Sequence, residues 1–221
     1  MASTLDRHLE VINARICAPG SPFETVTINR FGRDLPVFRN APPCLPALFA
    51  HFCAEYDARE FLVDGEVRLT FGETYALAER AARGLIARHG VKPGDHVGIA
   101  ARNSANWIIA YMAVLMAGGC ATLLNGWWTG EELAEGIALA ECTLVLADPA
   151  RAARIGRNAH GAAIAQFDHG APETGLVSIL AAPDDAAPLP TPEPDDRATI
   201  VFTSGSTGFS KAAFSDHRGV V

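Results

Sequence analysis

The sequence contains no cluster of Lys and Arg residues, and its formal net charge is −7. Surfaces that bind nucleic acids need such basic clusters to neutralise phosphates. The five cysteines show no C-x-x-C spacing, which argues against a disulfide framework or a zinc knuckle and favours a reducing compartment. The first eight residues mix acidic and basic side chains, unlike a secretory signal. We therefore expect a cytoplasmic protein that does not bind nucleic acid.

Formally charged side chains are also absent between Arg102 and Glu131, and the stretch from Trp107 to Leu124 is almost continuously apolar. Its length meets the first criterion for a membrane span. However, Gly118-Gly119 interrupts the run, and its alanine-rich first half is typical of a helix covered by protein on all sides. The sequence therefore favours a buried helix over a transmembrane span.

Two common nucleotide-binding patterns are missing as well. No G-x-G-x-x-G occurs, so a dinucleotide fingerprint is not predicted. A Walker A loop needs four residues between its glycines and Ser or Thr after its lysine. Here Gly205 and Gly208 are only three positions apart, and Ala212 follows Lys211. A phosphate-loop kinase or hydrolase is therefore not favoured.

What the chain does contain is a glycine- and hydroxyl-rich segment, TSGSTGFSK, at residues 203–211. It follows the apolar run 198–202, which predicts a buried strand. The glycines permit positive φ and a close approach to a ligand, the Ser and Thr residues supply hydroxyl groups, and Lys211 supplies a positive charge. On composition alone, such a segment is more often a flexible surface turn. The lysine favours a site for a polyphosphate.

This segment resembles the phosphate-binding loop of the adenylate-forming enzymes, which include acyl- and aryl-CoA synthetases, luciferases and the adenylation domains of peptide synthetases. Their pattern is T-S-G-[ST]-T-G-x-P-K-G; Ser210 and Ala212 depart from it, whereas His217 further on matches the histidine of the family's T-H-x-N. The resemblance implies a catalytic role for Lys211. It also implies that the phosphates of ATP are held by Thr203, Ser204, Gly205, Ser206, Thr207, Gly208 and Lys211.

The resemblance extends from about Leu45 to the end of the chain, most closely to acyl-CoA synthetases. It implies ATP-dependent activation of a carboxylic acid, fatty or aromatic, to an acyl-adenylate and then to a CoA thioester. ATP, Mg²⁺ and CoA would be the cofactors and co-substrates. The sequence identifies no metal ligands, because its seven histidines have no metal-like spacing and are expected at the surface or in packing.

The family's adenine-, ribose- and magnesium-binding segments and its mobile C-terminal domain would follow Val221. We therefore expect the 221 residues to be an incomplete N-terminal part, inactive alone and prone to associate. The alternative is a non-catalytic module, either a truncated relic or a nucleotide-binding subunit that a complementing chain completes.

The order of predicted elements indicates the α/β class. A strand at 96–101, a helix at 105–117 and a strand at 120–124 predict a parallel pair, and a helix to 140 and a strand at 143–147 continue it. The expected fold is a doubly wound, largely parallel sheet with flanking helices, the truncated N-terminal part of the adenylate-forming large domain. The predicted divisions are an arm (1–44), the α/β layer (45–182), a proline- and acid-rich connector (183–196) and the start of a second sheet unit (197–221).

Local signals add detail to this layer. Thr70/Glu73 and Thr129/Glu132 have capping-box spacing and predict helix starts. A helix is expected over 150–161 and a strand over 162–167. The adjacent Trp127 and Trp128 either line a cleft or mark an interface, but packing under a loop is the commoner arrangement.

Overall fold

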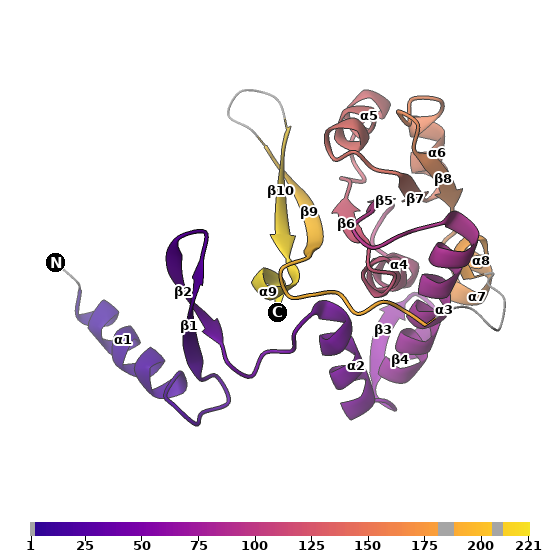
Figure 1. Ribbon diagram of the computed structural model, residues 1–221. Coiled ribbons are helices and arrows are strands. Elements are labelled where there is room, and N and C mark those ends of the chain that lie inside the picture. The colour runs from indigo at the N-terminus through magenta and orange to yellow at the C-terminus, as the bar shows by residue number, and fades with distance from the viewer. Residues whose placement is uncertain (1–2, 181–187, 205–209) are drawn as a thin grey trace. The chain divides into compact units, whose positions relative to one another are not determined.

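The computed structural model describes residues 3–180, 188–204 and 210–221 (Figure 1). The predicted site residues Gly205, Ser206, Thr207 and Gly208 lie outside these ranges, as does part of the expected connector. The chain divides into two compact units, residues 1–42 and 43–221, which are described separately.

The first unit consists of helix α1 (Thr4–Ile16) and an antiparallel hairpin of β1 (Thr25–Arg30) and β2 (Arg33–Phe38). The helix starts with a capping box in which the Ser3 hydroxyl accepts from the Asp6 N–H at 3.1 Å. None of residues 3–42 is buried.

The second unit contains all remaining described elements. Its helices are α2 (Leu45–Glu55), α3 (Phe71–His89), α4 (Ala105–Met116), α5 (Gly130–Leu139), α6 (Pro149–Ile155), α7 (Pro172–Gly175), α8 (Val177–Leu180) and α9 (His217–Val220). Its strands are β3 (Glu60–Asp64), β4 (Val67–Thr70), β5 (His96–Ala100), β6 (Cys120–Leu123), β7 (Leu144–Ala147), β8 (Ala163–Gln166), β9 (Arg197–Ser204) and β10 (Ser210–Asp216). Strands β3 and β4 form a separate antiparallel hairpin.

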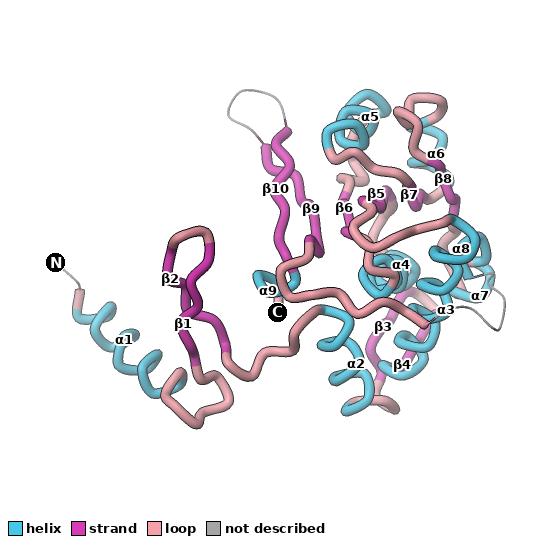
Figure 2. The backbone as a smooth tube through the Cα atoms, in the orientation of Figure 1, coloured by secondary structure: helices cyan, strands magenta, loops and turns pink. Residues whose placement is uncertain are grey.

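A six-stranded sheet with the order β10-β9-β6-β5-β7-β8 forms the centre of this unit (Figure 2). Every pairing is parallel except that of β10 with β9. The predicted α/β, largely parallel fold is therefore confirmed. The structure corrects one expectation, because β9 pairs with β6 and does not start a second sheet. Ala198 and Ile200 of β9 are both buried, and each belongs to one of the two core clusters of this unit.

Helices cover both faces of the sheet (Figure 1). Val97 and Ile99 of β5 belong to the core cluster that includes residues of α3, α4 and α8, whereas Ala100 belongs to the cluster that includes residues of α5 and α6. This alternation is expected for a strand buried on both faces. Helix α4 is apolar on nearly all sides because protein surrounds it. Among the described residues, no helix is both long enough and apolar enough to cross a membrane.

Both predicted capping boxes are present. The Thr70 hydroxyl accepts from the Glu73 N–H at 3.2 Å, and the Thr129 hydroxyl accepts from the Glu132 N–H at 3.3 Å. The helix expected over 150–161 is wrong in length, because α6 ends at Ile155. Gly156 follows with φ of 54° and ψ of −121°, a conformation that ends the helix and that glycine adopts readily.

Candidate functional site

The described candidate residues gather at the edge of the sheet formed by the carboxyl ends of its parallel strands. From β5 the chain proceeds to β6 on one side, and from β7 it proceeds to β8 on the other. Neighbouring strands β5 and β7 therefore define a topological switch point, where open α/β sheets bind ligands. Arg102 follows β5 at this point and Asp148 directly follows β7.

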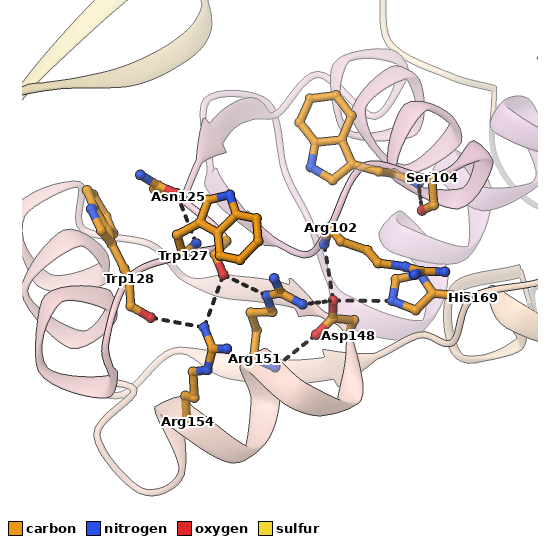
Figure 3. A network of polar contacts seen from close by, with 11 residues as sticks. Arg102, Ser104, Asn125, Trp127, Trp128, Asp148, Arg151, Arg154 and His169 are labelled. Carbon is orange, nitrogen blue, oxygen red and sulfur yellow. Dashed lines mark hydrogen bonds and ion pairs between the residues drawn. The ribbon is translucent and has the colours of Figure 1, made fainter. Parts of the chain in front are cut away.

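Asp148 lies at the centre of a polar network (Figure 3). Its side chain is only 1% exposed, yet it accepts from the backbone N–H groups of Arg102 at 3.1 Å and Arg151 at 2.8 Å. The Arg151 guanidinium donates to it at 2.9 Å, and His169 Nε2 lies 3.3 Å away. The carboxylate therefore joins the ends of β5 and β7 to the start of α6.

These partners keep Asp148 ionised. Burial alone would raise the pKa of this carboxyl group, but the N–H groups of Arg151 and Arg102 and the charges of Arg151 and His169 hold the pKa below its ordinary value. A buried carboxylate with this number of donors is a stable anion. Its hydrogen bonds connect the backbone of Arg102 with the backbone and side chain of Arg151.

Two arginines of α6 extend the network to the loop after β6. Arg151 Nε donates to the Gly126 carbonyl at 2.8 Å. Arg154 donates to the same carbonyl at 3.1 Å and to the Trp128 carbonyl at 3.2 Å. Figure 3 shows both guanidinium groups pointing at this loop. The carboxyl ends of β5, β6 and β7 are thus linked through Asp148.

The two tryptophans of this loop differ in environment. Trp127 is 87% exposed, so the expected packing under a loop is wrong for this residue. Trp128 is half-buried and makes an edge-to-face contact with Phe202 of β9, with ring centroids 5.0 Å apart. Beside the loop lies a hollow of about 480 Å³ lined by Ala101, Arg102, Asn103, Trp107, Leu123, Leu124, Asn125, Gly126, Trp127 and Arg151.

The predicted phosphate-binding residues lie on the hairpin of β9 and β10. Thr203 and Lys211 are direct cross-strand partners, and both are exposed. Because β9 is parallel to β6, its carboxyl end lies at the same edge as Asp148 and Arg102. Ser204 is the last residue of β9. The structure therefore brings Thr203 and Lys211 together as cross-strand partners. Residues 205–209, which connect the two strands in the sequence, lie outside the described part.

Nothing in the described ranges identifies a magnesium site. Mg²⁺ prefers several oxygen ligands in octahedral geometry. Within those ranges, no group of three or more His, Cys, Asp or Glu side chains is arranged to hold a metal ion. The described residues therefore include no identified ligands for Mg²⁺.

The sequence did not identify Asp148, Arg102, Arg151 or His169 as site residues. One signal was present, since Asp followed by Pro is typical of a helix N-cap and first position. Indeed the Asp148 side chain caps α6. His217 was expected in packing or at the surface, and it is buried with 1% exposure.

Comparison with known proteins assigns this arrangement to a family. The model of the family described as AMP-binding enzyme matches residues 49–221. The chain belongs to the AMP-binding enzymes. This agrees with the resemblance found at residues 203–211, and relatives of this AMP-binding chain include acid-CoA ligases and a tripeptide synthetase.

Two curated relatives illustrate the similarity. The medium/long-chain-fatty-acid–CoA ligase FadD6 of Mycobacterium tuberculosis is 35% identical over 190 residues, covering 81% of this AMP-binding chain and 30% of the relative. The 4-coumarate–CoA ligase 5 of Oryza sativa subsp. japonica is 33% identical over 168 residues, covering 74% of this chain and 31% of the relative. The chain therefore spans less than a third of the length of these relatives.

Solved structures show the same fold. The Klebsiella oxytoca NpsA N-terminal subdomain in complex with 3-hydroxybenzoyl-AMSN matches with a TM-score of 0.68 and 20% identity, covering 80% of this chain and 42% of that chain. A putative long-chain-fatty-acid CoA ligase from Rhodopseudomonas palustris matches with a TM-score of 0.67 and 23% identity, covering 79% of this chain and 44% of that chain.

Proposed function

We propose that this chain carries the phosphate-binding part of an enzyme that activates a carboxylic acid with ATP, forming an acyl-adenylate and then a CoA thioester. The observation that carries the proposal is the pairing of Thr203 with Lys211 on adjacent strands, at the edge of the sheet where ligands of this fold class bind. The segment between them matches the family's phosphate-loop pattern at every specified position except Ser210, where the family has proline.

In this proposal the chain's own groups bind and orient the triphosphate. The Thr203 hydroxyl would donate to a phosphate oxygen, and the Lys211 ammonium would stabilise the negative charge that develops on the departing pyrophosphate. Ser204, Gly205, Ser206, Thr207 and Gly208 would add hydroxyl and backbone donors. ATP, CoA and the acid are substrates, and Mg²⁺ would accompany ATP.

The acid is proposed to be a fatty or aromatic carboxylic acid. The support is that FadD6 is a fatty-acid–CoA ligase and that another relative is a 4-coumarate–CoA ligase. NpsA, which shares the fold, was solved with an aryl-AMSN compound.

The test compares the two lysines of the chain, Lys92 and Lys211, in the full-length protein. Lys92 is exposed and precedes β5, so it lies at the opposite, amino-end edge of the sheet. Lys211→Met should lower acid-dependent ATP–pyrophosphate exchange by about 100-fold or more, as expected for loss of one charge-stabilising donor. Lys92→Met should leave it unchanged.

Two outcomes would contradict the proposal. One is wild-type protein that neither binds ATP in calorimetry nor catalyses exchange with any fatty or aromatic acid, which would favour a non-catalytic module. The other is a normal exchange rate in Lys211→Met.

A further inference from the structure

The hairpin of β9 and β10 extends beyond its support in the sheet. Strand β9 pairs with β6 at only two positions, Ala121 with Thr199 and Thr122 with Ile200. Its pairing with β10 continues to Ser204 and Ser210. Phe202 and Thr203 therefore lie past the last backbone pairing that joins the hairpin to the other strands. Residues outside the hairpin that position Phe202 and Thr203 therefore act without strand pairing, through side-chain contacts.

Trp128 provides such a contact. Its indole meets the half-buried Phe202 ring edge-to-face, with an interplanar angle of 72°. Phe202 is adjacent to Thr203 and is the cross-strand partner of Ala212, which is adjacent to Lys211. The contact thus lies one residue away from both proposed phosphate-binding side chains in the described part of the hairpin.

The indole packs against α5, and the backbone that carries it is also held. A Cβ atom at Gly136 of α5 would come within 2.6 Å of an indole carbon, so the ring lies directly on the helix backbone. Arg154 donates to the backbone carbonyl of Trp128, and Arg151, which is paired with Asp148, donates to the carbonyl of Gly126 in the same loop (Figure 3). A ring held this closely has few alternative rotamers.

We infer that Trp128 is a positioning residue for the phosphate-binding hairpin, transmitting the fixed geometry of the Asp148 network to Phe202 and hence to Thr203 and Lys211. The expected effect of Trp128 on ATP binding rests on the proposed function. Its effect on the local stability of the β9–β10 hairpin does not depend on that function. Neighbouring Trp127 is 87% exposed and makes no ring contact with Phe202 among the described aromatic pairs.

The first experiment measures amide hydrogen exchange in the ligand-free, full-length protein, for peptides that cover residues 201–204 and 210–213. Trp128→Ala should raise the exchange rate there about 3- to 10-fold, because one aromatic contact is lost. Trp128→Phe should restore most of the protection. Trp127→Ala is the matched control and should leave exchange of these peptides unchanged.

Gly136→Ala is a second variant that leaves Trp128 intact but displaces its ring. It should raise exchange in the same peptides. If Trp128→Ala does not fold, as judged by circular dichroism, Gly136→Ala and Trp128→Phe still decide the question. Unchanged exchange in the folded variants would overturn the inference.

The second experiment separates positioning from general damage. In acid-dependent pyrophosphate exchange, Trp128→Ala should raise the KM for ATP about tenfold while the KM for the acid changes less than about twofold. An equal rise of both constants would overturn the specific role. A wild-type protein that does not turn over would overturn the proposed function, whereas the hydrogen-exchange result would still decide whether Trp128 holds the hairpin.

Discussion

The Nδ1 atom of His217 accepts a hydrogen bond from the Leu45 backbone N–H at 3.2 Å, across 172 residues of sequence. Leu45 is the first residue of α2 and His217 is the first residue of α9, directly after β10. The contact therefore joins the first and last described helices of the second unit. It requires a neutral imidazole, because a protonated Nδ1 cannot accept.

The first prediction is a pH dependence of stability from this histidine. Burial lowers the pKa of His217 from its ordinary 6.5, against the opposing effect of Asp196 and Asp216. The unfolded chain therefore binds the proton more readily than the folded chain. The contribution of neutral His217 to the free energy of unfolding is fully present above about pH 6.5, and it is lost as the pH falls through the lower pKa of the folded state. Urea unfolding of the wild type between pH 8 and 5 should show this loss.

His217→Gln keeps an acceptor without a titration and should flatten this part of the profile. His51 is the control, since its side chain is 64% exposed. His51→Gln should preserve the wild-type slope. An identical slope in His217→Gln and the wild type would contradict the prediction.

The second prediction concerns Asp148. Asp148→Ala removes the anion and leaves the Arg151 guanidinium, 12% exposed, without its carboxylate. The loss should reduce the free energy of unfolding by about 3–5 kcal/mol, the range for breaking a buried pair. Denaturant unfolding with an unchanged m value measures it.

Glu60 provides the matched control for this measurement, because its ion pair with Arg68 is exposed on both sides. Glu60→Ala should cost about 1 kcal/mol or less. Equal costs for Asp148→Ala and Glu60→Ala would show that the buried network contributes no special stability.

The third prediction concerns the contact between α3 and α8. A Cβ atom at Gly84 would overlap the carbonyl oxygen of Ile179, which belongs to the backbone and cannot rotate away. Gly84→Ala should therefore separate the two helices and cost about 1–3 kcal/mol, as overpacking does. Ala87→Ser, at an exposed position of the same helix, should change stability by less than about 0.5 kcal/mol. A stabilising Gly84→Ala would refute the close approach.

The fourth prediction concerns thiol reactivity. Burial raises the pKa of Cys120 to about 12 and of Cys142 to about 11, so both stay protonated and inaccessible at neutral pH. Cys44 and Cys53 are buried as well, whereas Cys17 is partly exposed. Iodoacetamide should label Cys17 first in the native protein, as read by peptide mass spectrometry. Early labelling of Cys120 or Cys142 would contradict the described packing.

The sequence predicted those elements whose signals are local. The starts of α3 and α5 follow from capping partners three residues apart. The length of α6 was missed because its alanine and arginine pattern continues past Gly156, although that glycine was a visible stop signal. Local interactions of this kind can be predicted from the sequence because both partners lie in one short segment.

The candidate site was less predictable because its contacts are not local. Asp148 meets Arg102 and His169 at separations of 46 and 21 residues, and no spacing rule connects them. The insertion of β9 beside β6 depends on the sheet order, which periodicity does not encode. The different environments of Trp127 and Trp128 depend on that order too, since the partner of Trp128 is on β9.

None of residues 3–42 is buried, whereas residues 43–221 contain every buried side chain described. Heat absorbed on melting, and the accompanying rise in heat capacity, come chiefly from newly hydrated apolar surface. A calorimetric trace of this protein should thus report almost entirely on residues 43–221.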